Sequence, residues 1–134
     1  MEIVITGWAL DSYLELKHNK SFSAEHYKNI IRPDVLLLKN FSTSPSPKFS
    51  SNKFWSPATF HNGSAVPGGF KMKWHNLGDK KVQLPLPVGM INDAFLLYAY
   101  VKTDPKVEAR QLAKFKTRLE LIRRGQYTEC GRLS

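Results

Sequence analysis

Cysteine is almost absent from this sequence of 134 residues, and so are long apolar runs. The single cysteine, Cys130, has no partner in the chain, which excludes an internal disulfide. The start of the chain has neither the basic residues nor the long apolar run of a signal peptide. The longest apolar run, residues 94–101, is far shorter than the roughly 20 residues that cross a bilayer. We therefore expect a cytoplasmic protein with no membrane segment.

Several chemistries lack their usual motifs. His61, His75 and Cys130 show none of the close spacings of metal ligands, so no metal site is expected. A Gly-rich phosphate loop ending in Lys and Ser or Thr is missing, and no nucleophile motif is present. The acidic residues are too scattered to nominate a catalytic carboxylate pair. The sequence therefore predicts no cofactor and argues against carboxylate-based hydrolysis.

Positive charge is the property that is present in excess. Twenty Lys and Arg residues stand against eleven Asp and Glu residues, which gives a net charge of +9. The net charge is 0 for residues 1–41, +4 for residues 42–101 and +5 for residues 102–134. Such a surface attracts polyanions, so nucleic acid is the first partner to consider. Acidic proteins and anionic lipids fit the same sign, and the charge can also serve solubility alone.

The first half of the chain predicts helices after one short strand. A β-branched run favours a strand over residues 3–5, and apolar spacing favours a helix over residues 8–17. Ser23 can cap a second helix that extends to Ile31, before a short buried element over residues 35–38. Residues 42–67 hold seven Ser and four Pro, which predicts a long loop with room for one short strand at 53–55.

The second half predicts strands followed by a helix. Alternating apolar residues favour a strand over 70–75, and turn residues join it to a strand over 82–88. Proline cannot donate to a ladder, so that second strand is expected at a sheet edge or bulged around Pro85. The apolar stretch 94–102 predicts a central strand, and Asp104-Pro105 predicts a helix over 105–124. No order is predicted for residues 126–134.

These elements predict one α+β domain, with N-terminal helices and a C-terminal helix packed on a small antiparallel sheet. If the last three strands are neighbours, one sheet face is open and carries cationic, imidazole, amide and phenol groups. They are Lys71, Lys73, His75, Gln83, Tyr98, Tyr100 and Lys102. On the terminal helix, Lys106, Arg110, Lys114 and Arg118 form a cationic ridge opposite the apolar stripe of Leu112, Phe115, Leu119 and Ile122.

Ammonium groups bind phosphates and phenol rings stack on unpaired bases, so this surface favours single-stranded RNA. Cleavage of RNA without metal needs a base, cations at the phosphate and an acid. The strand lysines, His75, Arg124 and Tyr127 can supply these groups. In the alternative interpretation, the two tyrosines pack under the Ser/Pro-rich loop and the lysines form a solvated strand face.

The order of elements resembles the RelE/ParE/HigB superfamily of toxins from toxin-antitoxin systems. The resemblance is carried by GGFKMKW, AFLLYAYVK and DPKVEARQLAKFKTRLELIRRG, within residues 68–127. It implies a small α+β toxin that cleaves mRNA without metal, often on the ribosome, and that an antitoxin neutralises. By position, it implies that Lys71, Lys73 and His75 line the active face and Lys102 closes the central strand. Arg124 and Tyr127 would reach that face from the C-terminus.

The sequence departs from the superfamily at Pro85 and Pro87, where members that cleave RNA tend to carry a cation on the open face. Three functions therefore stay open. The first is a toxin-like, metal-independent endoribonuclease, for which Pro85 leaves two alternatives, an inactive variant or a cationic site that is assembled differently. The second is a non-catalytic module that binds nucleic acid or an antitoxin, and the third is a ParE-like inhibitor of a protein such as gyrase.

Overall fold

The structure, a computed structural model, describes residues 1–60 and 62–134. Within them, six strands form one sheet in the order β2-β3-β4-β5-β1-β6. The strands are β1 Ile3–Thr6, β2 Trp55–Thr59, β3 Ala65–Leu77, β4 Val82–Ile91, β5 Asp93–Leu96 and β6 Glu129–Arg132. Neighbouring strands are antiparallel except β1 and β5, which are parallel. The predicted α+β class is therefore confirmed, with a mostly antiparallel sheet.

Two helical segments follow β1. Helix α1, Gly7–His18, begins where the side chain of Thr6 accepts a hydrogen bond from the Ala9 amide at 3.2 Å. The second segment, called the helical run, covers residues 24–40. It joins α2 Ala24–His26, a wide turn over Tyr27–Ile31, α3 Arg32–Leu36 and a tight turn over Leu37–Asn40. Ser23 caps the run as predicted, because its Oγ accepts from the His26 amide.

The helical run is longer than the sequence predicts. Pro33 has no amide to donate to the preceding turn, and the backbone widens over Tyr27–Ile31 just before it. The helix then resumes with Pro33 in its first turn, where a missing donor costs nothing. The short element predicted at 35–38 is consequently the end of this run.

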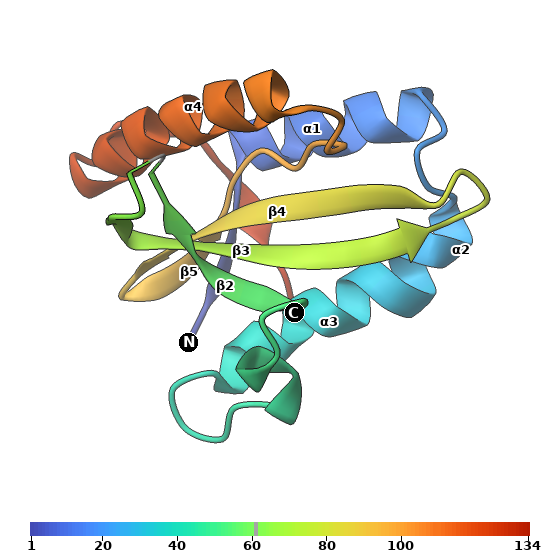
Figure 1. The fold of residues 1–134 in the computed structure, drawn as a ribbon. Helices are drawn as coiled ribbons and strands as arrows, with labels where there is room; N and C mark the ends of the chain where they lie inside the picture. The colour runs from blue at the N-terminus through green and yellow to red at the C-terminus, as the bar shows by residue number, and fades with distance from the viewer. Residues whose placement is uncertain (61) are drawn as a thin grey trace.

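The helices cover both faces of the sheet, and Figure 1 shows strands β3 and β4 between α4 and the run. Helix α4, Pro105–Arg123, packs on Val4, Phe95 and Leu97 of one face. Helix α1 and the helical run pack on the other face, against Met72 and Trp74. The expectation of one fully open face is therefore wrong, since α4 crosses that face.

Helix α4 matches its prediction closely. The Asp104 carboxylate accepts from the Val107 amide at 3.0 Å and caps the first turn. Phe115, Leu119 and Ile122 are buried against the sheet. Among the described residues, no helix combines the length and the apolar character that crossing a membrane requires.

Strand β4 lies inside the sheet, which corrects the prediction of an edge. The carbonyls of Pro85 and Pro87 accept from the amides of Tyr100 and Leu97, at 3.2 and 3.0 Å. Residues 97–102 therefore run beside β4 but receive no amide donors from these prolines. For the same reason β5 ends at Leu96, although the sequence predicts a strand to residue 102.

The predicted loop over 42–67 contains β2, the start of β3 and a short turn over Pro47–Ser50. Aromatic packing orders this part of the chain, as in the stacking of Trp55 on Phe70 with ring centroids 5.1 Å apart. His61 lies outside the described residues. The tail also gains order, because β6 pairs with β1 through partners such as Arg132 and Val4.

Candidate functional site

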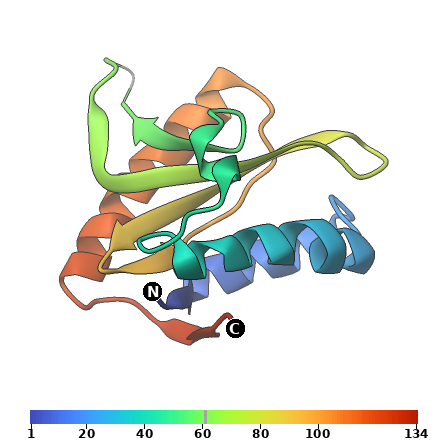
Figure 2. The same ribbon diagram turned by 90° about the horizontal axis from the view of Figure 1, so that it is seen from below.

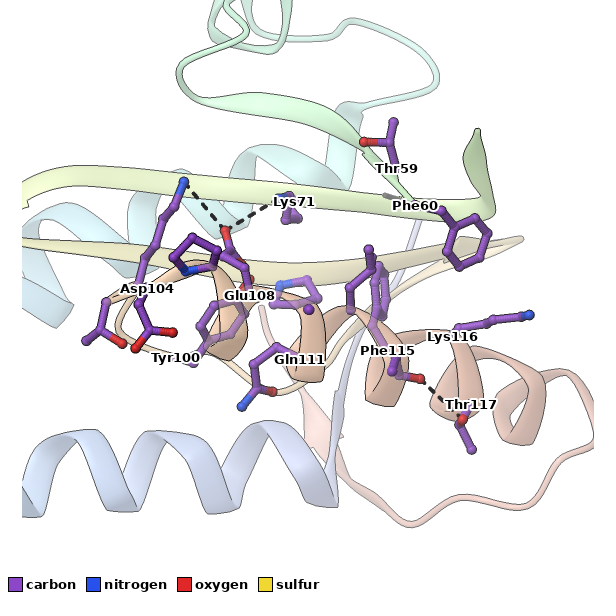
Figure 3. Close-up of a pocket in the computed structure, with 17 residues that line it drawn as sticks. Thr59, Phe60, Lys71, Tyr100, Asp104, Glu108, Gln111, Phe115, Lys116 and Thr117 are labelled. Atoms are coloured by element: carbon purple, nitrogen blue, oxygen red, sulfur yellow. Dashed lines mark hydrogen bonds and ion pairs between the residues drawn. The ribbon is translucent and has the colours of Figure 1, made fainter. Parts of the chain in front are cut away.

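Three lysines converge beside the first half of α4. Lys71 and Lys73 are two residues apart on β3, so both point to the face that α4 crosses. Lys102 comes from residues 97–102, which run beside β4. The Glu108 carboxylate lies 3.9 Å from Lys71 Nζ and 3.6 Å from Lys102 Nζ. Figure 3 shows Glu108 beside Lys71, with a dashed line for their ion pair. We call Lys71, Lys73 and Lys102 the lysine cluster.

The Tyr100 hydroxyl also binds Glu108, to which it donates a hydrogen bond. Burial raises the pKa of Tyr100, and the Glu108 carboxylate raises it further. The phenol therefore stays protonated and keeps Glu108 in place. This contact, together with 6 % exposure of Tyr100, removes its ring from the surface that was expected to stack on bases.

Lys73 has a different environment from its two neighbours. Its ammonium donates to Ser56 Oγ at 2.9 Å and to the backbone carbonyl of Asn52. Burial lowers its pKa, the positive charges of Lys71 and Lys102 lower it further, and Glu108 opposes them. Lys73 thus loses its proton more readily than an ordinary lysine.

His75 and Gln83 lie further along the same hairpin. His75 is two residues beyond Lys73 on β3, a separation of roughly 7 Å. Its Nε2 donates to the carbonyl of Lys53 at 2.7 Å, and its Nδ1 lies 2.6 Å from Gln83 Oε1. The ring is exposed. Its orientation is fixed by these two partners, and it sits at the end of the line of lysines.

A pocket of about 780 Å³ opens beside the cluster, between the first half of α4 and the sheet (Figure 3). Lys71, Lys102 and Glu108 form its charged wall. Phe60, Pro87, Leu112 and Phe115 supply apolar surface. Pro85 and Pro87 pair with Lys73 and Lys71 across β3 and β4. Two of the three cations of this site, Lys71 and Lys73, thus lie on the strand next to the prolines.

Arg124 and Tyr127 do not join the cluster. Arg124 follows the last turn of α4 and lies 3.6 Å from Glu120. At 1.5 Å per residue, the helix separates it from Glu108 by roughly 24 Å. Tyr127 packs edge-on against Phe95, with ring centroids 5.4 Å apart. The structure therefore places both residues at the opposite end of α4.

The remaining predicted RNA contacts divide into two groups. Arg110 and Lys114 are exposed on α4. Arg118 instead lies between the rings of Trp8 and Tyr98, at 5.4 and 5.2 Å from their centroids. Burial lowers the pKa of Arg118, and nearby Tyr98 opposes this effect. It joins α4 to α1, so the cationic ridge ends at Lys114.

Tyr98 is also used within the fold. Its hydroxyl donates to Glu15 of α1, while Arg118 covers its ring. Burial and the Glu15 carboxylate raise the pKa of Tyr98 to about 12. Tyr98 and Tyr100 thus donate to carboxylates of α1 and α4, and these contacts differ from the packing under the Ser/Pro-rich loop of the alternative interpretation.

Glu108, Asn52 and Ser56 belong to the site but were not predicted. Glu108 is an acidic residue in a basic helix, which is the one local signal that marks it. Asn52 and Ser56 lie in the Ser/Pro-rich stretch, where no periodicity relates them to Lys73. Their contacts arise from the pairing of β2 with β3.

No three His, Cys, Asp or Glu side chains gather as metal ligands in residues 1–60 and 62–134. His61, one of the residues considered from the sequence, is not among them. The comparisons with known proteins add no relative. The chain matches no known protein family, no curated protein and no solved structure.

Proposed function

We propose that the chain is a toxin-like endoribonuclease that cleaves single-stranded RNA without metal at the lysine cluster. In this proposal Lys71 and Lys102 hold the scissile phosphate, Lys73 is the base and His75 is the acid. The observation that carries it is that Lys71 and Lys102, from two chain segments, line one pocket and share Glu108, while Lys73 lies near enough for both of their charges to lower its pKa.

The reaction needs only groups of this chain and of the RNA. Neutral Lys73 takes the proton of a ribose 2′-hydroxyl, whose oxygen attacks the adjacent phosphorus. The bond from phosphorus to the 5′ oxygen breaks, and His75 gives that oxygen a proton. The products are a 2′,3′-cyclic phosphate and a 5′-hydroxyl. Lys71 and Lys102 stabilise the charge on the phosphate oxygens in the transition state.

The environment of Lys73 supports its assignment as the base. An amine accepts a proton only in its neutral form, and burial with two neighbouring cations lowers the pKa of Lys73. Glu108 supports the role of its partners, because it holds two ammonium groups where a phosphate can replace its carboxylate. Such an exchange gives the two ammonium groups an anionic partner both before and after RNA binds.

The order of elements supports the toxin interpretation. Helices, antiparallel strands and a basic helix follow one another in the order on which the resemblance to RelE-like toxins rests, and β6 comes after that helix. That resemblance further implies mRNA as substrate, the ribosome as its place of action and an antitoxin as partner. A gene for a small acidic protein beside this one would favour that pairing.

A second candidate is an RNA-binding module that does not cleave. The partners of His75 favour it, since both ring nitrogens already have hydrogen-bond partners within the domain. In that case the lysine cluster binds phosphates, and His75 only braces the hairpin. The two candidates differ in the product and not in the affinity.

Incubation of a single-stranded RNA with the chain in excess chelator tests both candidates. The endoribonuclease yields fragments with cyclic phosphate ends, and Lys73→Met and His75→Ala each lower the rate roughly a hundredfold or more. Lys17→Met removes the same charge from an exposed position on α1 and serves as the matched control. RNA that is bound but stays intact supports the second candidate, and full activity of both variants contradicts the assigned roles.

A further inference from the structure

An apolar crevice lies on the sheet face opposite the lysine cluster. It runs between α1 and the helical run, and the sheet forms its floor. Figure 2 shows these two helical segments on the same side of the sheet, with the C-terminal strand β6 nearby. The crevice has a volume of about 280 Å³. Its inner lining includes Leu16, Phe22, Ile31, Leu84, Leu86 and Leu96.

An open apolar space of this size needs a physical explanation. Protein interiors are close-packed, and each unfilled cavity weakens the fold in proportion to its volume. Water gains little in such a place, because the lining offers few hydrogen-bond partners. The volume lies near the lower end of ligand pockets, which hold roughly 300–1,000 Å³. A small apolar ligand is therefore a suitable occupant.

The crevice also has a polar group of defined chemistry. Arg32, Tyr13 and Tyr27 are among its lining residues. The rings of the two tyrosines are 5.0 Å apart. Burial raises the pKa of Tyr27, nearby Tyr13 raises it further and Arg32 opposes them. A guanidinium beside protonated phenols offers hydrogen-bond donors and a positive charge, which is the environment that a carboxylate prefers.

The tail of the chain already imitates such a ligand. Leu133 lines the crevice, and Arg32 Nη2 donates to the carbonyl oxygen of Ser134 at 2.6 Å. An apolar group therefore lies in the crevice while an attached oxygen accepts from the guanidinium. The preceding strand β6 is exposed along its whole length. A ligand that offers both features can replace this tail.

We propose that the crevice binds an unbranched aliphatic carboxylate, with its chain along the apolar floor and its carboxylate on Arg32. The carboxylate takes the position of the Ser134 oxygen, so Leu133 and the ligand compete. A carboxylate forms a charge-assisted hydrogen bond to the guanidinium. This inference is independent of the proposed ribonuclease, whose site is on the other face.

Calorimetric titration of the full chain with hexanoate, octanoate and decanoate tests the proposal. We expect saturable binding of one molecule per chain, with affinity that rises up to fourfold for each added methylene until the crevice is full. Octanol is the uncharged control and should bind roughly tenfold or more weakly than octanoate. Absence of saturable binding for all three acids would overturn the proposal, and would leave the crevice to an apolar protein segment.

Variants of the chain separate the carboxylate contact from general charge. Arg32→Gln should weaken octanoate tenfold or more and leave octanol unchanged. Lys28→Gln removes an exposed cation one turn earlier in the helical run, and should not change octanoate binding. Leu133→Gly should tighten octanoate binding, because it removes the competitor. Equal losses for Arg32→Gln and Lys28→Gln, or equal affinity for octanol and octanoate, would contradict a carboxylate site at Arg32.

Discussion

The contact between Phe115 of α4 and Gly69 of β3 allows a quantitative test of how the helix docks on the sheet. Phe115 is 2 % exposed, and replacement of such a residue by alanine typically costs about 3–5 kcal/mol of unfolding free energy. With a urea dependence of about 2 kcal/mol per molar, Phe115→Ala should lower the unfolding midpoint by roughly 1.5–2.5 M.

Gly69 provides the second half of the test. A Cβ at this position would lie 3.0 Å from Phe115 Cε2 and 3.1 Å from Val66 Cβ, so Gly69→Ala overpacks the contact. Overpacking of this kind typically costs about 1–3 kcal/mol. In the Phe115→Ala background the new methyl group enters the vacated space, so the cost should fall by about 1 kcal/mol or more.

Urea unfolding of the two single variants, the double variant and the parent gives the coupling directly. Lys114→Ala, on the exposed side of α4, is the control and should change the free energy by less than about 0.5 kcal/mol. Additive effects of Phe115→Ala and Gly69→Ala would show that the two residues do not touch. An unchanged midpoint for Phe115→Ala would refute the docking of α4 on the sheet.

Three further outcomes follow from the lysine cluster and the cap of α4. The pKa of Lys73 in the folded protein lies below 10.5, the ordinary value for lysine. The charged form of Lys73 therefore lowers the free energy of unfolding at lower pH, and this loss of stability disappears as the pH rises towards 10.5. Lys71→Met should raise that pKa and Glu108→Gln should lower it, and shifts of equal sign in an NMR titration would contradict the assigned neighbours. RNA affinity should fall with salt with a logarithmic slope of roughly 0.7 for each phosphate bound, so about 0.7 for the one phosphate that Lys71 and Lys102 hold, and a flat dependence would favour a protein target. Asp104→Ala should cost about 1 kcal/mol in thermal unfolding by removal of the bond from the Val107 amide, and no loss would mean that the cap does not stabilise α4.

The elements that were predicted correctly are those with local signals. Asp104 and Pro105 mark the start of α4, and its buried stripe repeats at helical spacing. Thr6 and Ser23 likewise cap the segments that follow them. Each of these signals acts within about four residues, so the sequence alone contains the necessary information.

The elements that were missed depend on partners far away in the chain. Strand β3 begins at Ala65, within the Ser/Pro-rich stretch, because it pairs with β2. Proline is typical of sheet edges, yet Pro85 and Pro87 lie inside the sheet. Their carbonyls accept hydrogen bonds from the amides of residues 97–102, so that segment needs no amide donor from the prolines. Helix α4 covers a sheet face that we expected from the sequence to be open. Alternation of apolar and polar residues assigns side chains to the two faces of a strand, but it does not show which other element packs on either face.

The candidate site shows the same division. Alternation placed Lys71, Lys73 and His75 on one face of β3, and the structure has them there. The resemblance implied that Arg124 and Tyr127 join these residues, but α4 separates Arg124 from Glu108 by roughly 24 Å. The length of the helix was predicted, but the local signals do not show which end of it lies beside the lysines, because that depends on how α4 crosses the sheet.

The position of β1 has a consequence for synthesis of the protein. Ile3 pairs with Ala94, and the Thr6 hydroxyl donates to the carbonyl of Leu96, 90 residues later. At 5–20 residues per second, the ribosome needs roughly 5–18 s to supply these partners. Throughout that time the apolar strand has nothing to pair with and is a binding site for chaperones. We therefore expect the domain to fold late, when most of the chain has left the ribosome, so mutations that delay the pairing of β1 and β5 should lower the yield of protein before they lower its stability.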